Sequence, residues 1–323
     1  MQFRLEFEPK ALSPKINIAD DIMLLGSCFT EHMNDKLSQC KFNTLQNPHG
    51  VLFNPISISN AIKSYSTFSL VDHADLFFHQ GIWNHWSFHS SRSKTDADQT
   101  IACMNNNISA GNIFLQKAGW LIITFGAAFV YEINQNYTVA NCHKMPDHIF
   151  NKRMLQIDEI VDNYTSLIGD LKLFNPGLKI IFTVSPVRHS RDGFVENNRS
   201  KSVLLLSIER IISEHANTFY FPSYELVIDD LRDYRFYAED MVHPNYLATQ
   251  YVWEKFAASS IDGKSREIFK ELEQINNAVK HRPLHPNSDE HKKFIAKFSS
   301  LVESLSIRFP SLNFDFEKQF FTN

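Results

Sequence analysis

The chain has 323 residues, of which 43% are apolar and 13% aromatic, and it contains 28 phenylalanines but only ten glycines. This composition excludes collagen-like, linker-like and disordered proteins, because so many apolar side chains can fill a core. The formal net charge of −4, from 32 basic and 36 acidic side chains without a basic stripe, argues against nucleic acid and anionic membranes as main partners.

The first eight residues alternate apolar and charged side chains, which predicts a strand, and they lack the apolar segment of a signal peptide. The longest apolar stretch, residues 120–131, is too short to span a membrane. The four cysteines have no C-x-x-C spacing, which favours reduced thiols over a disulfide framework. From these features we expect a cytoplasmic protein without a membrane span.

Short apolar runs alternate with longer helical patterns along the chain. Strands are predicted at residues 22–25, 42–45, 120–125, 179–184 and 218–221, and helices at 30–37, 156–174 and 200–215. A further helix after Pro244 is expected to bury Leu247, Tyr251, Val252 and Phe256 on one face. The strand runs are continuously apolar, which is typical of a parallel sheet covered on both faces. The sequence therefore predicts a doubly wound α/β sheet, which binds ligands at the carboxyl ends of its strands.

Two regions do not follow this alternation. Residues 65–91 are rich in histidine and aromatic side chains without a clear period, which indicates a long insertion near the strand ends. Residues 265–279 and 289–305 are predicted helices that are joined by a proline-containing turn. We therefore expect one large domain over residues 1–258 and a helical C-terminal extension over residues 259–323.

Ser27 follows the first predicted strand and opens the helix after it. A serine at this place has its hydroxyl group at the ligand-binding edge of the sheet, and the backbone N–H groups that follow can face a developing oxyanion. Gly26 gives the turn its room. The same position also suits a serine that only caps the helix. Cys28 is a rival nucleophile, although a small buried residue fits that position equally well.

Asp240 and His243 lie in a loop after the fifth predicted strand. An aspartate three residues before a histidine can hold one ring nitrogen within a single loop, so that the other nitrogen serves as a base. Pro244 favours an extended backbone at His243, which keeps the ring out of the following helix. The spacing is not specific by itself, but it gains weight when a serine ends the first strand of the same sheet.

Six motifs occur in a fixed order along the chain. They are Gly26-Ser27-Cys28-Phe29, residues 47–55 (NPHGVLFNP), Thr124-Phe125-Gly126, Asn141-Cys142-His143-Lys144, Ser185-Pro186-Val187-Arg188-His189 and residues 240–244 (DMVHP). Together they resemble the GSCFA domain, from about residue 3 to residue 256. GSCFA domains are grouped with the SGNH or GDSL-like hydrolases. The resemblance implies a flavodoxin-like three-layer α/β/α sandwich with a mostly parallel five-stranded sheet, followed by a helical C-terminal appendage.

The resemblance also implies roles for individual residues. Ser27 would be the nucleophile, His243 the general base and acid, and Asp240 the carboxylate that orients the histidine. The backbone N–H groups of Cys28 and Gly50 would form the oxyanion hole.

One segment departs from the pattern of SGNH hydrolases. These enzymes commonly supply an asparagine from a Gly-x-Asn-Asp segment after the third strand, whereas this chain has Gly126-Ala127-Ala128 there. Asn141 and Asn54 are the candidates for the third oxyanion donor, because both lie in motifs that resemble the family.

Other polar and aromatic residues are candidates for the substrate pocket, since aromatic rings with polar tips suit sugar or acyl ligands. They are Asn54, Trp86, His89, His143, Arg188 and His189. The aromatic residues fit equally well in a loop packed on the core. No spacing of histidines and carboxylates indicates a metal site, and no glycine-rich phosphate loop is present, so we expect no cofactor.

The sequence thus predicts a serine hydrolase that acts on an ester or acyl group, for example an acylated carbohydrate, through Ser27, His243 and Asp240. Two alternatives stay open. An acyltransferase would use the same site with a sugar hydroxyl in place of water. A carbohydrate-binding or scaffold protein without catalysis would keep the fold, and the missing Gly-x-Asn-Asp segment favours this alternative.

Overall fold

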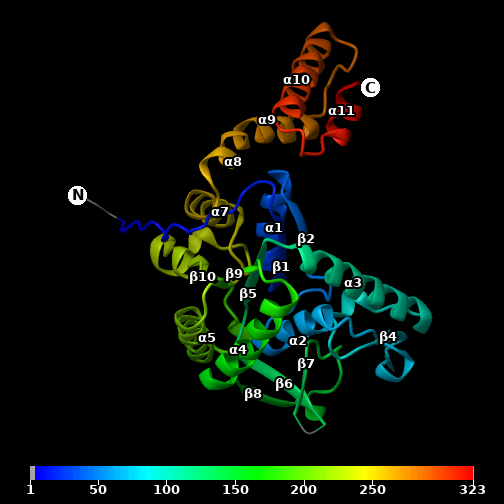
Figure 1. Cartoon of the computed structure of the whole chain (residues 1–323), viewed down its shortest axis with the longest axis vertical. Helices are drawn as coiled ribbons and strands as arrows, with labels where there is room; N and C mark the ends of the chain where they lie inside the picture. Colours follow the sequence, from blue (N-terminus) through cyan, green and yellow to red (C-terminus); the bar gives the residue numbers. More distant parts are fainter. Residues whose placement is uncertain (1–3, 135, 323) are drawn as a thin grey trace.

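A five-stranded sheet in which all neighbouring strands are parallel forms the centre of the molecule (Figure 1). The structure is a computed structural model that describes residues 4–134 and 136–322. The strand order is β10-β9-β5-β1-β2. The bounds are β1 Asp21–Gly26, β2 Asn43–Gln46, β5 Trp120–Phe125, β9 Lys179–Val184 and β10 Thr218–Tyr220. The five strands were all predicted, and their order is that of a flavodoxin-like fold.

Alternate residues of the strands point to two separate layers of helices. Met23 and Leu25 face a core that is filled by α2 (Pro55–Ser66), α3 (Ala97–Lys117), α4 (Ile157–Phe174) and α5 (Phe194–Glu214). Ile22 and Leu24 face the second core, which α1 (Phe29–Gln39), α7 (Tyr246–Ser260) and the π-helical segment Leu226–Leu231 cover. This period of two, with apolar residues on both faces, produces the predicted three-layer sandwich.

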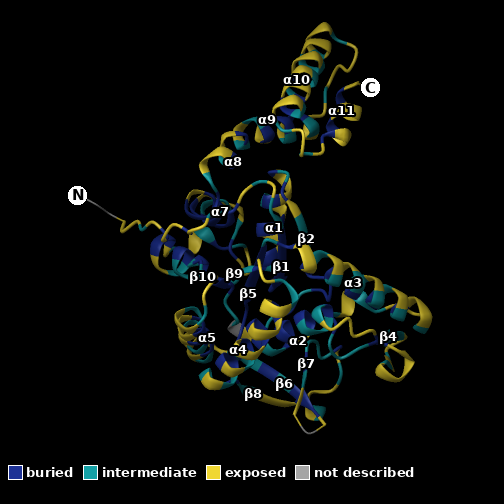
Figure 2. Cartoon of the chain, viewed as in Figure 1, coloured by how far each residue is buried: buried dark blue, intermediate teal, exposed yellow. Residues whose placement is uncertain are grey.

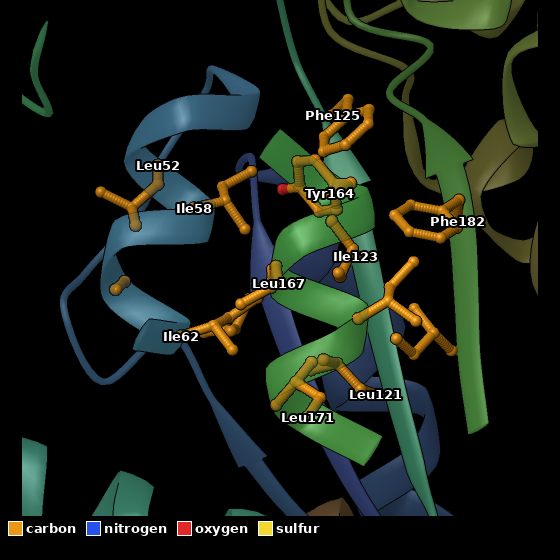
Figure 3. Packing of buried hydrophobic residues seen from close by; sticks show 14 of the residues in the cluster. Leu52, Ile58, Ile62, Leu121, Ile123, Phe125, Tyr164, Leu167, Leu171 and Phe182 are labelled. Carbon is orange, nitrogen blue, oxygen red and sulfur yellow. The ribbon is translucent and has the colours of Figure 1, made fainter. Parts of the chain in front are cut away.

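Helix α4 shows how the sequence specifies one of these layers. Its buried residues follow a helical spacing, and Tyr164, Leu167 and Leu171 pack against Leu121 and Ile123 of the sheet (Figure 3). At its start the Glu159 carboxylate accepts from the backbone N–H of Gln156 at 2.7 Å, which satisfies a donor that the helix itself leaves unpaired.

Two small antiparallel sheets lie outside the central one. The insertion predicted at residues 65–91 contains the hairpin of β3 (Phe77–His79) and β4 (Ile82–Asn84). The second sheet has the order β7-β6-β8. It consists of β6 Phe129–Ile133, β7 Tyr137–Val139 and β8 Asn151–Met154. The long apolar stretch of residues 120–131 therefore divides between two sheets, because the chain turns after Phe125.

The strand predicted at the beginning of the chain is wrong for residues 4–8, which have no regular secondary structure. Residues 1–3 lie outside the described residues. The side chains of the segment form ion pairs instead: Arg4 contacts Asp230, and Glu6 and Glu8 contact Lys255. Alternation of apolar and charged residues yields a strand only where a neighbouring strand supplies backbone partners.

A second prediction needs correction within α7. Val252 and Phe256 are buried as expected, but Leu247 is 61% exposed. The buried face runs instead through Ala248, Val252 and Phe256, which are four residues apart and so lie above one another.

The C-terminal helices have a hydrophobic core of their own, which includes Leu272, Ile275 and Leu305. They are α8 Gly263–Glu267, α9 Phe269–Lys280, α10 Asp289–Arg308 and α11 Asp315–Thr322. Figures 1 and 2 show them at one end of the molecule, with exposed faces along α10. The predicted division at residue 258 falls inside α7, and Ile261 still belongs to the second core of the large domain.

Within residues 4–134 and 136–322, no helix combines the length and the apolar character that a membrane crossing requires.

Candidate active site

The loops that follow the parallel strands meet at one edge of the central sheet. Ser27 follows β1, and Gly126 follows β5. The loop from Ser185 to His189 follows β9. The carboxyl ends of parallel strands are the usual ligand-binding edge of such a sheet, so the predicted site residues are expected at this edge.

Ser27 is held tightly at the end of β1. Its backbone N–H donates to the carbonyl oxygen of Thr124 at 3.2 Å. Gly26 adopts a φ of 138°, and a Cβ at this position would lie 2.2 Å from the same carbonyl oxygen, so only glycine fits. The Ser27 side chain is 1% exposed, and its Oγ has no hydrogen-bond partner among the described residues.

The first N–H groups of α1 follow Ser27 directly. The N–H groups of Thr30 and Glu31 donate to the carbonyl oxygens of Ser27 and Cys28. The N–H groups of Cys28 and Phe29 come just before these bonds, at the start of α1. The start of a helix carries a partial positive charge, so these N–H groups lie in a region that favours an anion. Burial raises the pKa of the Cys28 thiol, and the nearby Glu31 adds to this effect. A thiol with a raised pKa is a poor nucleophile, which leaves the serine as the better candidate.

Asp240 and His243 form the pair that their spacing predicted. The Nδ1 of His243 lies 2.6 Å from the Oδ2 of Asp240. The other oxygen, Oδ1, accepts the backbone N–H groups of Val242 and His243, each at 2.9 Å. These two backbone hydrogen bonds and the imidazole lower the pKa of Asp240 to about 2. The carboxylate is therefore ionised at neutral pH and oriented toward the ring.

This loop lies against the segment that follows β9. The backbone N–H of Arg188 donates to the carbonyl oxygen of Val242 at 3.2 Å, which fixes the Asp240–His243 pair to the same edge of the sheet as Ser27. No hydrogen bond joins His243 to Ser27 in the described part of the chain. The structure thus joins Asp240 to His243, and among the described residues Ser27 Oγ has no hydrogen bond to either of them.

Of the expected oxyanion donors other than Cys28, Gly50 and Asn54 already have hydrogen-bond acceptors. The N–H of Gly50 donates to the carbonyl oxygen of Asn47 at 2.8 Å. Asn54 caps α2, accepting from the N–H of Ser57 at 2.8 Å and donating to its hydroxyl group at 3.0 Å. The Oδ1 of Asn141 accepts the N–H of His143 at 2.7 Å. An oxyanion would have to displace the bonds of Gly50 or Asn54. The bond of Asn141 orients its side chain within a local turn through Oδ1.

The aromatic insertion lies over the turn that follows β2. The N–H of His89 donates to the carbonyl oxygen of His49 at 2.9 Å, and Arg92 donates to those of Asn47 and Pro48, also at 2.9 Å. A Cβ at Gly50 would lie 2.4 Å from the Cβ of His89, so this close approach requires glycine. The insertion therefore forms a rim above the strand ends.

Trp86 of this rim lies beside His143, a residue of the loop after β7, with ring centroids 5.8 Å apart, and it stacks on Phe77 at 3.9 Å. Burial lowers the pKa of His143 to about 4, and it also lowers the pKa of His89. Both histidines are therefore neutral at pH 7. Neutral imidazoles can exchange hydrogen bonds with an uncharged ligand.

Arg188 and His189 follow β9. The guanidinium of Arg188 lies 5.8 and 5.5 Å from the ring centroids of Tyr234 and Tyr237. The ring of His189 meets that of Phe53 edge to face at 5.9 Å. Burial, followed by the positive charge of Lys201, lowers the pKa of His189 to about 4.

Lys201 is a residue of this region that the sequence reasoning missed. It is buried on α5, and its Nζ donates to the carbonyl oxygens of Gly126 and Ser185, each at 2.7 Å. Burial lowers its pKa to about 7. The sequence does contain a signal for this lysine, because Lys201 lies in helical register with Leu204 and Ile208 on the buried face of α5. A lysine in an apolar stripe requires partners, and here the ends of β5 and β9 supply them.

Among residues 4–134 and 136–322, no group of three or more histidine, cysteine, aspartate or glutamate side chains is arranged to hold a metal ion.

The fold and the site define a class: a flavodoxin-like α/β protein with a serine at the end of the first strand and an Asp-x-x-His loop at the same edge. The chain belongs to the GSCFA family, whose model matches residues 21–256. The model of the GSCFA domain protein C-terminal domain matches residues 272–323. No curated protein matches the sequence.

Several solved structures are similar to the chain at low identity. A carbohydrate esterase family 3 protein from Talaromyces cellulolyticus is 9% identical, with a TM-score of 0.37, over 78% of this chain and 99% of the other. A family 3 carbohydrate esterase from Clostridium thermocellum is 8% identical, with a TM-score of 0.34, over 79% and 98%. The acetyl xylan esterase Est2A from Butyrivibrio proteoclasticus is 10% identical, with a TM-score of 0.36, over 79% and 64%.

Proposed function

We propose that this protein is a serine hydrolase that cleaves an ester or acyl group, with Ser27 as nucleophile, His243 as general base and acid, and Asp240 as the orienting carboxylate. The observation that carries the proposal is the 2.6 Å contact between Asp240 and His243, in a loop that is bonded to the segment that follows β9. An ionised carboxylate on Nδ1 leaves Nε2 as the proton acceptor.

In the proposed reaction, Ser27 Oγ attacks the acyl carbonyl carbon while its proton passes to Nε2 of His243. The carbonyl oxygen becomes an oxyanion, which the N–H of Cys28 and the positive end of α1 stabilise. His243 then gives the proton to the leaving alcohol. Water hydrolyses the acyl-enzyme by the same steps in reverse. The neutral His143 and the ring of Trp86 are candidates to contact the rest of the substrate, for example a sugar.

The free protein lacks a hydrogen bond between Ser27 and His243. Catalytic hydrogen bonds are often long in unliganded enzymes and shorten when substrate binds. The loops after β9 and around Asp240 would therefore have to move toward Ser27 in the complex, and the buried Oγ would become accessible in the same movement.

A fluorophosphonate probe, which reacts with activated serines, tests the proposal. We expect wild-type protein to gain one adduct on the peptide that contains Ser27 and to hydrolyse p-nitrophenyl acetate. The Ser27→Ala variant should lose both properties, whereas Ser202→Ala, a substitution on the exposed side of α5, should keep them. Labelling that persists in Ser27→Ala, or wild-type protein that neither reacts nor turns over, would contradict the proposal.

One observation favours a binding protein without catalysis. Ser27 Oγ is buried and has no partner among the described residues, so the hydroxyl group is not activated in this state. If the protein binds its ligand without catalysis, wild-type protein should show no adduct and no turnover, but acetylated oligosaccharides should change the fluorescence of Trp86. Loss of the fluorescence change in Trp86→Phe would assign the binding to the rim.

A further inference from the structure

Asn47, the first residue after β2, contacts the strand that carries Ser27. Its backbone N–H donates to the carbonyl oxygen of Leu24 at 2.9 Å, and its Oδ1 accepts the N–H of Gly26 at 2.9 Å. Because the partner of Oδ1 is an N–H donor, this contact fixes which way the side-chain amide points. The Nδ2 group is therefore the free end of an amide that already touches the residue before Ser27.

This Nδ2 group is buried without a hydrogen-bond partner in the part of the chain that the structure describes. A buried donor without a partner loses its hydration and gains no bond in return, so native proteins contain few of them. Ser27 Oγ is in the same condition. With Gln46 Oε1, three buried polar atoms without described partners thus lie on the neighbouring ends of β1 and β2, where Leu24 pairs with Gln46.

The backbone of Asn47 is held in place from several sides. Its φ is 40°, in the left-handed region, which is unfavourable for a residue with a side chain. Its carbonyl oxygen accepts both the N–H of Gly50 and the guanidinium of Arg92. A strained residue that several neighbours immobilise, and that presents an unused donor, has the properties of a preorganised binding group.

We propose that Asn47 is the side-chain donor of the oxyanion hole, an inference that rests on the proposed hydrolase function. When the bond between Ser27 Oγ and the acyl carbon forms, the π electron pair moves to the carbonyl oxygen, which accepts from Asn47 Nδ2 and from the N–H of Cys28. The serine proton goes to His243. On collapse of the intermediate the electron pair re-forms the carbonyl group, and the leaving alkoxide takes the proton from His243.

Two observations, one on the sequence and one on the structure, are consistent with Asn47 as this donor. The chain has Gly126-Ala127-Ala128 where an asparagine was expected, and the N–H of Gly50 is bonded to Asn47 itself. Asn47 supplies an amide donor at the same sheet edge from β2 instead of β5.

The variant Asn47→Asp tests the proposal, because aspartate keeps the shape and the acceptor for the Gly26 N–H but removes the donor. We expect kcat for p-nitrophenyl acetate to fall by about 10²–10³-fold, with KM changed by less than about threefold. Affinity for an alkyl boronic acid, which forms a tetrahedral adduct on serine, should fall in parallel. Asn106→Asp, on the exposed face of α3, makes the same charge change and should leave all three constants unchanged.

The outcomes separate this inference from the function on which it rests. If wild-type protein reacts with fluorophosphonate and Asn47→Asp turns over at the wild-type rate, Asn47 is not the donor and the hydrolase function stands. If wild-type protein neither reacts nor turns over, the hydrolase function itself fails.

A measurement on wild-type protein covers the case in which the variant does not fold. The side-chain amide proton of Asn47, observed by NMR in uniformly ¹⁵N-labelled protein, should shift downfield when the boronic acid binds. The resonance of Asn106 should not move. An unmoved Asn47 resonance in the boronate complex would overturn the proposal.

Discussion

The interior of the central sheet and its carboxyl edge differ in how completely their groups are satisfied. All six residues of β5 are buried, and ladders on both sides pair the strand. At the carboxyl edge, by contrast, Asn47 and Met241 have left-handed backbones. Ser27 and Asn47 also have buried polar atoms without partners among the described residues. The strand interior is therefore paired on both sides, whereas the carboxyl edge holds polar atoms that have no partner among the described residues.

The physical reason lies in where strands end. Within the sheet each N–H and carbonyl group finds a partner on a neighbouring strand, and apolar side chains leave no polar atom to satisfy. At the edge the chain must turn, so the backbone takes unusual conformations and side chains have to supply the missing partners. Substitutions in the two regions should consequently affect different properties.

The largest expected effect is on reactivity at the edge. In Asp240→Asn the amide oxygen can still accept the N–H groups of Val242 and His243, but the NH₂ group cannot accept from Nδ1. The histidine then holds the wrong tautomer, and we expect the rate of fluorophosphonate labelling of Ser27 to fall by about 10²–10⁴-fold. Labelling reactions that are stopped at successive times and analysed by mass spectrometry measure this rate.

The matched control is Asp233→Asn, which removes a carboxylate that pairs with Arg235 in a nearby turn. We expect it to keep the wild-type labelling rate. Equal labelling rates for wild type and Asp240→Asn would show that the aspartate has no part in activating the serine.

The next effect is on the stability of the interior. Leu121→Ala removes a fully buried side chain of β5, and we expect the free energy of unfolding to fall by about 2–5 kcal/mol, because the packed neighbours cannot close the cavity. Leu173→Ala, on a side chain that is 86% exposed, should change it by less than about 0.5 kcal/mol. Urea denaturation of the two variants compares these values, and similar losses would refute the distinction between interior and surface.

The smallest effect concerns Lys201, which joins the interior to the edge. Its pKa of about 7 in the folded protein lies below the value of about 10.4 in an unfolded chain. Between these two pH values the unfolded state binds more protons, so the lysine makes stability rise with pH, by at most about 1.4 kcal/mol per pH unit. Relative to Lys201→Met, the stability of wild-type protein should therefore increase from pH 7 to pH 9.

Urea denaturation at pH 6, 7, 8 and 9 tests this, with Lys172→Met on the exposed side of α4 as the control whose difference from wild type does not depend on pH. A difference between wild type and Lys201→Met that stays constant over this range would contradict a lowered pKa for Lys201.

The central strands and α4 could be predicted because their signals are local. A continuous apolar run is enough for a strand that is buried on both faces, and a period of 3.6 is enough for an amphipathic helix. Helix α3 and the outer sheet of β6, β7 and β8 were missed. The sequence of α3 carries three consecutive asparagines, residues 105–107, which obscure the apolar period. The outer strands are only three to five residues long.

The features of the candidate site also divide into those that local sequence specifies and those that distant contacts specify. The pairing of Asp240 with His243 is a property of one short loop, since three residues separate them and the backbone of the loop holds the carboxylate. The sequence by itself therefore determined this pair, the serine at the end of β1, and the sheet that places their loops at one edge. These features depend on neighbours along the chain and on the rule that parallel strands end together.

Only the tertiary structure decided which groups at that edge already have partners. The contact of Asn47 with Gly26 spans 21 residues, and that of Lys201 with Gly126 spans 75. Both depend on strand register and on how α5 packs on the sheet, which no local pattern encodes. The N–H of Gly50 is occupied within its own turn by the carbonyl oxygen of Asn47. The long-range bond from Gly26 occupies Oδ1 of Asn47 and leaves its Nδ2 without a partner among the described residues. The availability of a donor is thus a property of the folded chain, because each group is free or occupied according to what packing brings beside it.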